Sequence, residues 1–563
     1  MANQDSELRP ETDVLVVGAG PVGLSVGLQL AQASIDAQIV ERRPSLSLHP
    51  KANGIFSRTM EVFRQWGIGE RVAEVALPPE QCLGFAWLTR MNGIELGRIM
   101  FAQNVEELID GHSCASPEIP RFAPQDRIER LLADEIGRSS SVGLQLGQQV
   151  VGIEQSDGYA TVTVQGPDGL RRQVRARYVV AADGSRSSVK ELMGLPEDAA
   201  TPWGESVNIY FESEECDRLR AGRPYQLWWV INADVRGAFW PVSHAHRWIF
   251  TPEGVPGVDV SYYSPSVCAD LIRRGAGVPV DLKIISATLW QQEMGILERW
   301  REGCVFFAGD AAHRFPPHGG FGMNSGIQDA QNLAWKLIAT LKGTAGPGLL
   351  DSYEAERKPV AQSNAALTVR NAERVKETGW FTPNPAELDV IERAEGQGVR
   401  DRIAQAVSRQ DASVHSLGQQ FGTVYQSRAV LSDGTRAPPS SVADYRPSAS
   451  PGARAPHLWI KSDLGTLSTL DLCEPAGLAM LVGEQGVMWR EAAHTLPMPV
   501  PVYSVGTGAV DFHCDDFPMH YGIEKAGAVL LRPDGHVAWR AAKAPSNAAG
   551  DLRSAVRRIL AWT

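Results

Sequence analysis

Three glycines near the N-terminus have the spacing of a phosphate-binding turn. Gly18, Gly20 and Gly23 follow an apolar run at 13–17 and open a stretch with helical spacing at 21–33. Glycines let a backbone turn tightly and approach a pyrophosphate, while the helix N-terminus offers unpaired N–H groups and the positive end of its dipole. Glu41 ends a second expected strand, where a carboxylate accepts hydrogen bonds from ribose hydroxyls. The pattern predicts a dinucleotide-binding βαβ unit rather than an incidental glycine-rich turn.

Two later motifs each place a carboxylate after a buried strand. Asp183 follows the run at 178–181 and precedes a glycine and several serines, an order that is also common in turns and helix caps, so both interpretations stay open. Asp310 follows the run at 305–308, and a Pro- and Gly-rich turn at 316–322 then leads into a helix. The N-terminus of such a helix can lie against the pyrimidine end of a flavin and stabilise the anion that forms on reduction.

The elements that must position these motifs follow from apolar periodicity. Buried strands are expected at 13–17, 37–41, 149–164, 173–182 and 304–308, and helices from about 325 to 342 and onward to about 409. The stretch 203–292 alternates like a β-sheet at 225–232, 238–242 and 248–251. After a Ser- and Pro-rich stretch at 426–455, an α/β pattern starts afresh with strands at 479–482 and 500–505 and a hairpin over 527–540.

Composition and charge exclude several classes of protein. The 563-residue chain is too long for one core, and its formal net charge of −11 argues against nucleic acid or an anionic membrane as a partner. No signal peptide and no apolar run near the ~18 residues of a membrane span are evident. Seven scattered cysteines without a CxxC pair indicate free thiols in a reducing cytoplasm. His313 and His318 have no third ligand nearby in the sequence, so we expect no metal site.

In this order, the three motifs resemble those of the single-component flavoprotein monooxygenases that hydroxylate aromatic rings, relatives of p-hydroxybenzoate hydroxylase and phenol monooxygenase. Residues 49–54, 58–61 and 124–129 are similar to segments of the chlorophenol and polyketide hydroxylases that carry an extra C-terminal thioredoxin-like domain. The sequence Gly-Phe-Gly-Met-Asn at 320–324 is also similar to flavoenzymes of indolocarbazole formation.

The resemblance implies a modular α/β architecture. A Rossmann-like FAD-binding domain (1–80, 115–195 and 293–410) is interleaved with a β-sheet substrate-binding domain (81–114 and 196–292). A linker (411–455) and a thioredoxin-like α/β domain (456–563) complete the chain. The latter holds only Cys473 and Cys514, in no CxxC motif, which predicts a redox-inert module that packs on the flavin domains or helps to form a homodimer.

Carried over by position, the family's roles imply a set of cofactor-binding residues. Near the pyrophosphate, ribose and adenine these are Gly18, Gly20, Pro21, Val22, Gly23, Glu41 and Arg42. Along the rest of FAD they are Lys51, Arg58, Gln125, Asp183, Asp310, Pro317, Gly320, Gly322, Met323 and Asn324. Lys51 and Lys190 stand where many members have Arg; lysine keeps the charge and loses the bidentate fork.

The resemblance also implies the chemistry. Non-covalent FAD would be reduced by NADPH or NADH, and O₂ would then transfer one oxygen atom to an aromatic or polyketide-like substrate through a C4a-hydroperoxyflavin. The chain has no second strand–GxGxxG–helix unit, which agrees with transient docking of the nicotinamide. Two alternatives stay open: a flavoenzyme of the same fold that catalyses oxidation, ring cleavage or decarboxylation, and a non-catalytic flavin-binding protein.

The substrate residues are the least defined part of the prediction. Candidate pocket walls in the β-rich stretch are Tyr225, Trp228, Trp229, Phe239, Trp240, His244 and His246. About half of them must face away from any pocket, because side chains alternate along a strand, and plain core is the alternative for each. We select Tyr225, Phe239 and Trp240 as substrate contacts, and His318 and Tyr225 as weak catalytic candidates; the sequence names no catalytic base.

Overall fold

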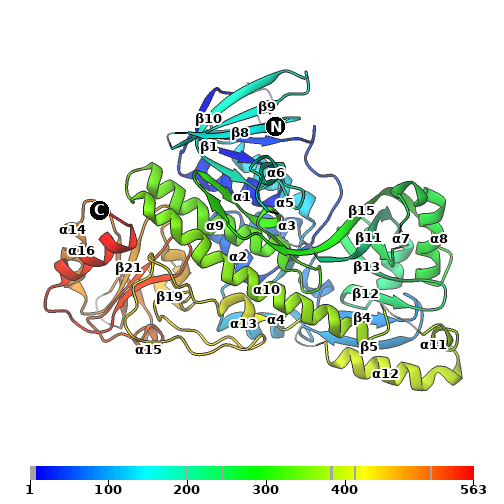
Figure 1. The fold of residues 1–563 in the computed structure, drawn as a ribbon. Coiled ribbons are helices and arrows are strands. Elements are labelled where there is room, and N and C mark those ends of the chain that lie inside the picture. Colours follow the sequence, from blue (N-terminus) through cyan, green and yellow to red (C-terminus); the bar gives the residue numbers. More distant parts are fainter. Residues whose placement is uncertain are drawn as a thin grey trace.

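The computed structural model describes residues 8–156, 158–196, 201–243, 245–254, 257–380, 384–410, 414–463, 465–507 and 510–562. His244, one of the candidate pocket walls, lies outside these residues. In the part of the chain that is described, three large sheets are linked by the long helices α9 and α10 (Figure 1). None of the described helices is both long and apolar enough to cross a membrane.

The first sheet is built on the βαβ unit at the N-terminus. Its order is β16-β17-β10-β1-β2-β7, and β9 and β8 extend it from β10. Strand β1 pairs in parallel with β10 and β2, and β17 and β7 continue the parallel arrangement outward. Parallel strands are buried on both faces, which explains the apolar runs in β1 and β2. The strands are β1 (Glu11–Val17), β2 (Ala37–Glu41), β7 (Val142–Leu146), β8 (Gln149–Ser156), β9 (Tyr159–Gln165), β10 (Arg171–Ala181), β16 (Arg301–Glu302) and β17 (Val305–Phe307).

Helices cover this sheet and enclose its core. Helices α1 (Pro21–Gln32), α2 (Ser57–Gln65), α3 (Gly69–Val75), α5 (Gln125–Ile136) and α6 (Ser188–Leu192) belong to it, and so does the small sheet of β3 (Gly54–Ile55) and β6 (Arg121–Phe122). Helix α9 (Phe321–Leu341) is buried over most of its length. It packs its apolar residues on the N-terminal core on one side and on the C-terminal domain on the other.

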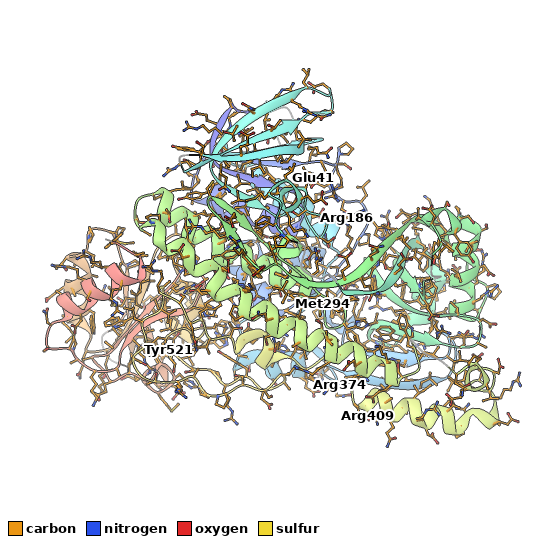
Figure 2. The ribbon with its side chains drawn as sticks, viewed as in Figure 1. Glu41, Arg186, Met294, Arg374, Arg409 and Tyr521 are labelled. Atoms are coloured by element: carbon orange, nitrogen blue, oxygen red, sulfur yellow. The ribbon has the colours of Figure 1, made fainter. Side chains whose placement is uncertain are left out.

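The second sheet has the order β18-β15-β11-β14-β13-β12-β4-β5. Its strands are β4 (Gly84–Leu88), β5 (Glu95–Met100), β11 (Thr201–Glu212), β12 (Tyr225–Ile231), β13 (Arg236–Ser243), β14 (Arg247–Pro252), β15 (Lys283–Ile296) and β18 (His313–Arg314). Helices α7 (Glu214–Arg220) and α8 (Pro265–Ala276) pack on one face. Strand β15 runs from this sheet toward the first, with Met294 near the end that pairs with β18 (Figure 2). The two sheets are therefore joined directly by a strand.

The C-terminal domain contains a third sheet of order β20-β19-β23-β22-β21-β24-β25. Its strands are β19 (Trp459–Ser462), β20 (Gly465–Ser468), β21 (Ala479–Gly483), β22 (Val502–Gly506), β23 (Phe512–His513), β24 (Ala528–Leu531) and β25 (Val537–Ala541). Helices α14 (Val487–His494) and α16 (Ala548–Ile559) pack on one face and α15 (Phe517–Tyr521) on the other. Helix α10 (Ser352–Glu377) and helices α4 (Val105–Ser113), α11 (Pro385–Leu388), α12 (Gln397–Ser408) and α13 (Leu417–Phe421) complete the chain.

The predicted fold class is confirmed, since α/β, β-rich and α/β parts follow one another as expected. The expected strand at 149–164 is a hairpin of two strands, β8 and β9. Helix α9 begins at Phe321, four residues before its expected start, because two glycines rather than the polar residues after them form the turn. The exact domain boundaries stay a prediction, and β15 runs past the boundary proposed at 292.

Candidate functional site

The glycine-rich turn has the shape that a pyrophosphate requires. Gly18 has a φ of +104°, and a Cβ there would lie 2.4 Å from the carbonyl oxygen of Ala182. A Cβ on Gly23 would lie 1.9 Å from the carbonyl oxygen of Gly18, so both positions allow only glycine. At Gly20, which precedes α1, a Cβ would meet no atom within 4 Å. Helix α1 begins at Pro21, which has no N–H, and its N-cap Gly20 makes no side-chain hydrogen bond, so the N–H groups from Val22 onward fit a phosphate.

Glu41 lies at the end of β2, beside the glycine turn (Figure 2). Its carboxylate accepts hydrogen bonds from the N–H of Ala19 at 2.9 Å and from the backbone N–H and Nε of Arg43, each at 2.9 Å. Burial works to raise the pKa of Glu41, but these hydrogen bonds hold it below its ordinary value. The ionised carboxylate thus braces the turn. Arg42 is exposed at the surface next to it.

Asp310 follows directly after β17 and Gly309. Its side chain is exposed, and the surrounding protein raises the pKa of its carboxyl, with His313 and Lys51 acting in the opposite direction. The preceding Gly309 has a φ of +59° and donates its N–H to Asp329 on α9 at 3.2 Å. Asp310 is therefore held at the bend between the first sheet and α9.

The N-terminus of α9 also faces open space. Gly319 and Gly320 have φ values of +116° and +73°, which turn the chain sharply into the helix after the exposed Pro317. A Cβ on Gly322 would meet nothing within 4 Å, whereas Met323 packs on the core beneath. The side chain of Asn324 accepts from the N–H of Phe56 and donates to the carbonyl oxygens of Gly54 and Gly320. Asn324 thereby ties the helix to β3.

Gln125 and Asp183 are two further cofactor candidates, each near the start of a helix. Gln125 begins α5, donates its N–H to the carbonyl of Ala52 and its Nε2 to Glu129, and so lies beside the exposed Lys51. Asp183 accepts hydrogen bonds from the hydroxyl of Ser188 and the N–H of Val189 in the first turn of α6, whose N-cap is Ser187. Its buried Oδ1 has no partner in the described residues.

Arg58 lies between α9 and the C-terminal domain. Its guanidinium donates to Gln331 on α9 at 3.2 Å and to the carbonyl oxygen of Asp534, in the C-terminal domain, at 2.8 Å. Glu61 pairs with Arg58 at 3.2 Å and with Arg454. The structure thus gives Arg58 a contact between domains.

His313 and His318 have different surroundings. His313 is buried, and its Nε2 lies 2.6 Å from Asp329, which also pairs with Arg357 at 2.7 Å. Burial lowers the pKa of His318 to about 4, so this residue is neutral at ordinary pH. The described residues contain no group of three or more His, Cys, Asp or Glu side chains that could hold a metal ion.

The candidate pocket aromatics occupy both faces of the second sheet. Phe239 is fully buried and stacks on Phe250 at 4.0 Å, beneath α8. Tyr225 belongs to the same core, although its hydroxyl donates to Glu95 and accepts from Arg98. Trp240 lies on the opposite face with Tyr210. The core alternative therefore describes Phe239. Of the three selected residues, Trp240 alone lies on the face that the loop after β2 meets through His49.

The other described wall candidates do not join Trp240. Trp228 is buried in the core beneath α8, while Trp229 packs on Trp87 and Trp380. His246 is exposed at a turn, where its Nδ1 lies 2.6 Å from Asp217. Neither tryptophan belongs to the cluster of Trp240.

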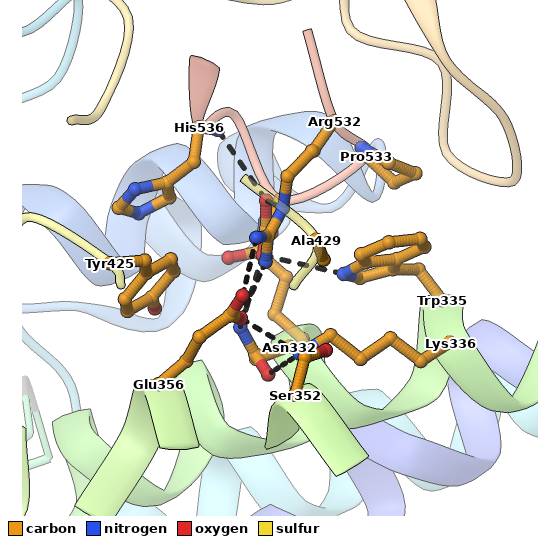
Figure 3. Close-up of polar contacts among 12 residues, drawn as sticks. Asn332, Trp335, Lys336, Ser352, Glu356, Tyr425, Ala429, Arg532, Pro533 and His536 are labelled. Carbon is orange, nitrogen blue, oxygen red and sulfur yellow. Dashed lines mark hydrogen bonds and ion pairs between the residues drawn. The ribbon is translucent and has the colours of Figure 1, made fainter. Parts of the chain in front are cut away.

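A buried ionic cluster joins the C-terminal domain to α9 and α10 (Figure 3). Arg532 donates to both oxygens of Glu356 at 2.6 and 2.7 Å and also pairs with Asp534 at 2.5 Å. Lys336 on α9 pairs with Glu356 at 2.7 Å, and burial lowers the pKa of Lys336 to about 8. Tyr425 stacks on His536 beside them. We call Lys336, Glu356, Arg532 and Asp534 the interdomain cluster.

Sequence reasoning missed Asp329, Arg357 and this interdomain cluster. Asp329 and Lys336 stand seven residues apart in a helix that is otherwise uncharged, and Glu356 and Arg357 are adjacent in the next helix. Charged residues in an apolar helix are a usable signal of buried pairs, since buried charges require partners.

The comparisons with known proteins decide the family. Residues 11–368 match the family model of an FAD binding domain, and residues 448–562 match that of the aromatic-ring hydroxylase C-terminal region. The chain belongs to the FAD-binding aromatic-ring hydroxylases. The predicted resemblance and the FAD cofactor are thereby confirmed, and the open glycine turn, Asp310 and the N-terminus of α9 fit that cofactor.

Similar hydroxylases span the whole chain. The tetracenomycin A2 monooxygenase-dioxygenase of Streptomyces glaucescens is 34% identical over 98% of this chain and 97% of its own. The 2,4-dichlorophenol 6-monooxygenase of Cupriavidus pinatubonensis is 32% identical over 98% and 96%. The crystal structure of the flavin-dependent monooxygenase PieE with FAD and substrate superposes with a TM-score of 0.90, at 30% identity over 98% and 99%.

Proposed function

We propose that this hydroxylase is an NADPH- or NADH-dependent monooxygenase that inserts one oxygen atom into an aromatic or polyketide-like substrate. The observation that carries the proposal is that the start of α1, the turn after β17 and the start of α9 meet. A Cβ on Gly309 would lie 2.7 Å from the side chain of Val22, and a Cβ on Gly326 would lie 3.2 Å from the Cα of Gly309. FAD, when bound, supplies the redox chemistry and the activation of O₂.

The chain's own residues would then bind, orient and shield. Gly18, Gly20 and Gly23 would hold the pyrophosphate with the N–H groups that open α1, and Glu41 would keep that turn in shape. The N-terminus of α9 would place its positive dipole end against charge that develops on the reduced cofactor. The sheet with Trp240 would exclude water from the reacting atoms.

The test is oxygen incorporation. The purified protein is expected to hold FAD that denaturation releases, to oxidise NADPH or NADH faster when an accepted aromatic compound is present, and to form a product that carries one atom from isotopically labelled O₂. Substrate-stimulated consumption without labelled product would support the oxidation or decarboxylation alternative instead. Absence of flavin reduction by either nicotinamide, with every aromatic compound screened, would support the non-catalytic alternative.

The proposal extends to location and assembly. All seven cysteines are free, which suits a reducing cytoplasm.

In the C-terminal domain, burial raises the pKa of Cys473 to about 12 and also raises that of Cys514, so neither thiol suits redox exchange. We propose a redox-inert module that braces the FAD domain and contributes to a homodimer. Light scattering tests the dimer, and unchanged turnover in the Cys473→Ser/Cys514→Ser variant tests the redox role.

A further inference from the structure

One carboxylate, that of Asp329 on α9, holds both ends of the turn that carries Asp310. The turn Gly309–Ala311 follows β17, and Asp310 is its exposed residue. A single Asp329 oxygen accepts from the backbone N–H of Gly309 at 3.2 Å and lies 2.6 Å from Nε2 of His313. Gly309 stands directly before Asp310, and His313 stands three residues after it. The backbone on either side of Asp310 is therefore tied to the same oxygen atom.

The Asp329 carboxylate is ionised and is itself held in place. Burial works to raise its pKa, but the charge of Arg357 and the contact with His313 hold that pKa below its ordinary value. Its second oxygen accepts from Nε of Arg357, on α10, at 2.7 Å. Arg357 in turn donates to the hydroxyl of Tyr425 at 3.1 Å and to the carbonyl oxygen of Ser325 at 3.2 Å. Arg357 thus fixes the carboxylate through the oxygen that does not contact the turn.

The His313 ring is held by packing as well as by this hydrogen bond. The side chain is buried, its ring stacks on Phe315 with the ring centres 4.6 Å apart, and the centre of the Trp300 ring lies 5.3 Å away. Because an ionised carboxylate can only accept, His313 donates to Asp329 from Nε2. The two contributions can be separated by substitution, since phenylalanine keeps a ring without a donor, and glutamine keeps a donor amide without a ring.

We propose that Asp329 and His313 are positioning residues, which hold the Asp310 carboxylate, through the backbone of the turn, in the orientation in which it binds FAD. Within the part of the chain that the structure describes, the Asp310 carboxylate makes no hydrogen bond or ion pair of its own, so its direction depends on that backbone. A contact group that is fixed before the ligand arrives lowers the entropy cost of binding. The inference rests on the predicted contact of Asp310 with FAD and not on the reaction proposed above.

A buried ion pair that serves folding alone is the alternative to a positioning role. Asp329 pairs with Arg357 at 2.7 Å, and removal of the carboxylate would leave that cation buried without its partner, which destabilises the whole fold. Asp329 variants alone would therefore not separate the two roles. His313 separates them, because its substitution leaves the ion pair intact and breaks only the hydrogen bond that follows Asp310 in the chain.

The experiment measures the dissociation constant of FAD, from flavin fluorescence as the holoenzyme is diluted. The variants are His313→Phe, His313→Gln and Asp329→Asn, each made in the wild type and in Asp310→Ala. Glu356→Gln is the matched control, because Glu356 is a buried carboxylate on α10 that pairs with Lys336 and Arg532 rather than with the turn. The melting temperature of every variant is recorded, so that a loss of stability is seen apart from a loss of FAD affinity.

The expected result is a loss of FAD affinity that depends on Asp310. His313→Phe should raise the dissociation constant about tenfold, because it removes one hydrogen bond that orients the turn, and Asp310→Ala should raise it at least as much. His313→Gln, which keeps the donor, and Glu356→Gln should stay within about twofold of the wild type. In the Asp310→Ala background, His313→Phe should change the constant by less than about twofold, since no carboxylate is left to position. Asp329→Asn should follow His313→Phe in both backgrounds, and if it does not fold, the His313 variants decide.

Three results would overturn the inference. The first is an effect of His313→Phe that is equally large with and without Asp310. The second is a loss of affinity in His313→Gln as large as that in His313→Phe, which would assign the effect to ring packing. The third is wild-type affinity in Asp310→Ala. None of these results depends on turnover, so the proposed function would stand or fall separately.

Discussion

Replacing Arg532 by methionine tests whether the interdomain cluster holds the C-terminal domain on the FAD domain. The Arg532 side chain is fully buried and donates to the carboxylates of Glu356 and Asp534. In the native cluster two cations, Arg532 and Lys336, face these two carboxylates. Without Arg532, one cation remains against two buried carboxylates.

The magnitude follows from that imbalance. Removal of one partner from a buried ion pair costs about 3–5 kcal/mol, because it leaves an uncompensated buried charge. Burial and the repulsion from Arg532 both lower the pKa of Lys336, which pairs with Glu356. Removal of Arg532 should therefore raise the pKa of Lys336 and recover part of the lost free energy of unfolding. We expect Arg532→Met to lower the free energy of unfolding by about 3–5 kcal/mol.

The assay is denaturant unfolding of the FAD-loaded protein, followed by tryptophan and by flavin fluorescence. Arg490→Met is the matched control, because Arg490 lies in the same domain and makes an exposed ion pair with Asp511 at 2.7 Å. Such a pair contributes at most about 1 kcal/mol. The double variant Arg532→Met/Glu356→Gln leaves Lys336 and Asp534 as a balanced pair, so it should lose about 1–3 kcal/mol less than the sum of the single changes.

Two outcomes would refute this reasoning. If Arg532→Met lowers the free energy of unfolding by no more than Arg490→Met does, the interdomain cluster stabilises the protein no more than a surface ion pair. Full additivity in the double variant would mean that Arg532 and Glu356 do not act on one another.

Three further predictions concern the site and its surroundings. Asp310→Ala should weaken FAD binding by about 1–3 kcal/mol, because donors that the carboxylate satisfies lose their partner; wild-type affinity in a flavin titration would contradict this. Trp240→Leu should raise the KM of the aromatic substrate at full FAD content, whereas Phe239→Leu, in the core, should lower the melting temperature and leave KM unchanged; the reverse pattern would exchange their roles. Burial lowers the pKa of His536 from 6.5 to about 3. Between these two pH values the unfolded chain binds more protons than the folded protein. The contribution of neutral His536 to the free energy of unfolding is therefore full above pH 6.5 and is lost as the pH falls toward 3. At about pH 5, His536 lowers the free energy of unfolding by about 2 kcal/mol relative to neutral pH. A stability–pH curve for His536→Gln that is as steep as that of the wild type would contradict this effect.

Local patterns in the sequence predicted most of the fold and part of the site. The βαβ unit, the glycine turn and the bend at 316–322 were recognisable because each depends on the backbone of adjacent residues. Gly18 and Gly23 are examples: a Cβ at either position would overlap main-chain atoms of the turn or of the neighbouring strand. The strands of the second and third sheets were found in the same way, from alternation and apolar runs.

The sequence predicted that the strands are present better than it predicted which side of a sheet each side chain faces. The alternation in β13 requires Phe239 and Trp240 to point to opposite sides, but it does not say which side meets the FAD domain. That choice depends on where α8 packs, and α8 lies about thirty residues further along the chain. Tyr225 shows the same limit, since its ring joins the core while its hydroxyl contacts β5.

By itself, the sequence determined where the chain turns, which strands are buried and where a pyrophosphate can approach, since these features depend on residues that are close together in the chain. The tertiary structure decided the partners of the charged residues. Arg58, whose cofactor role stays a prediction, contacts Asp534 in the C-terminal domain, and Glu356 pairs with Arg532, which is 176 residues away. A buried charge is stable only beside its partner, and no local pattern encodes which distant segment brings that partner into place.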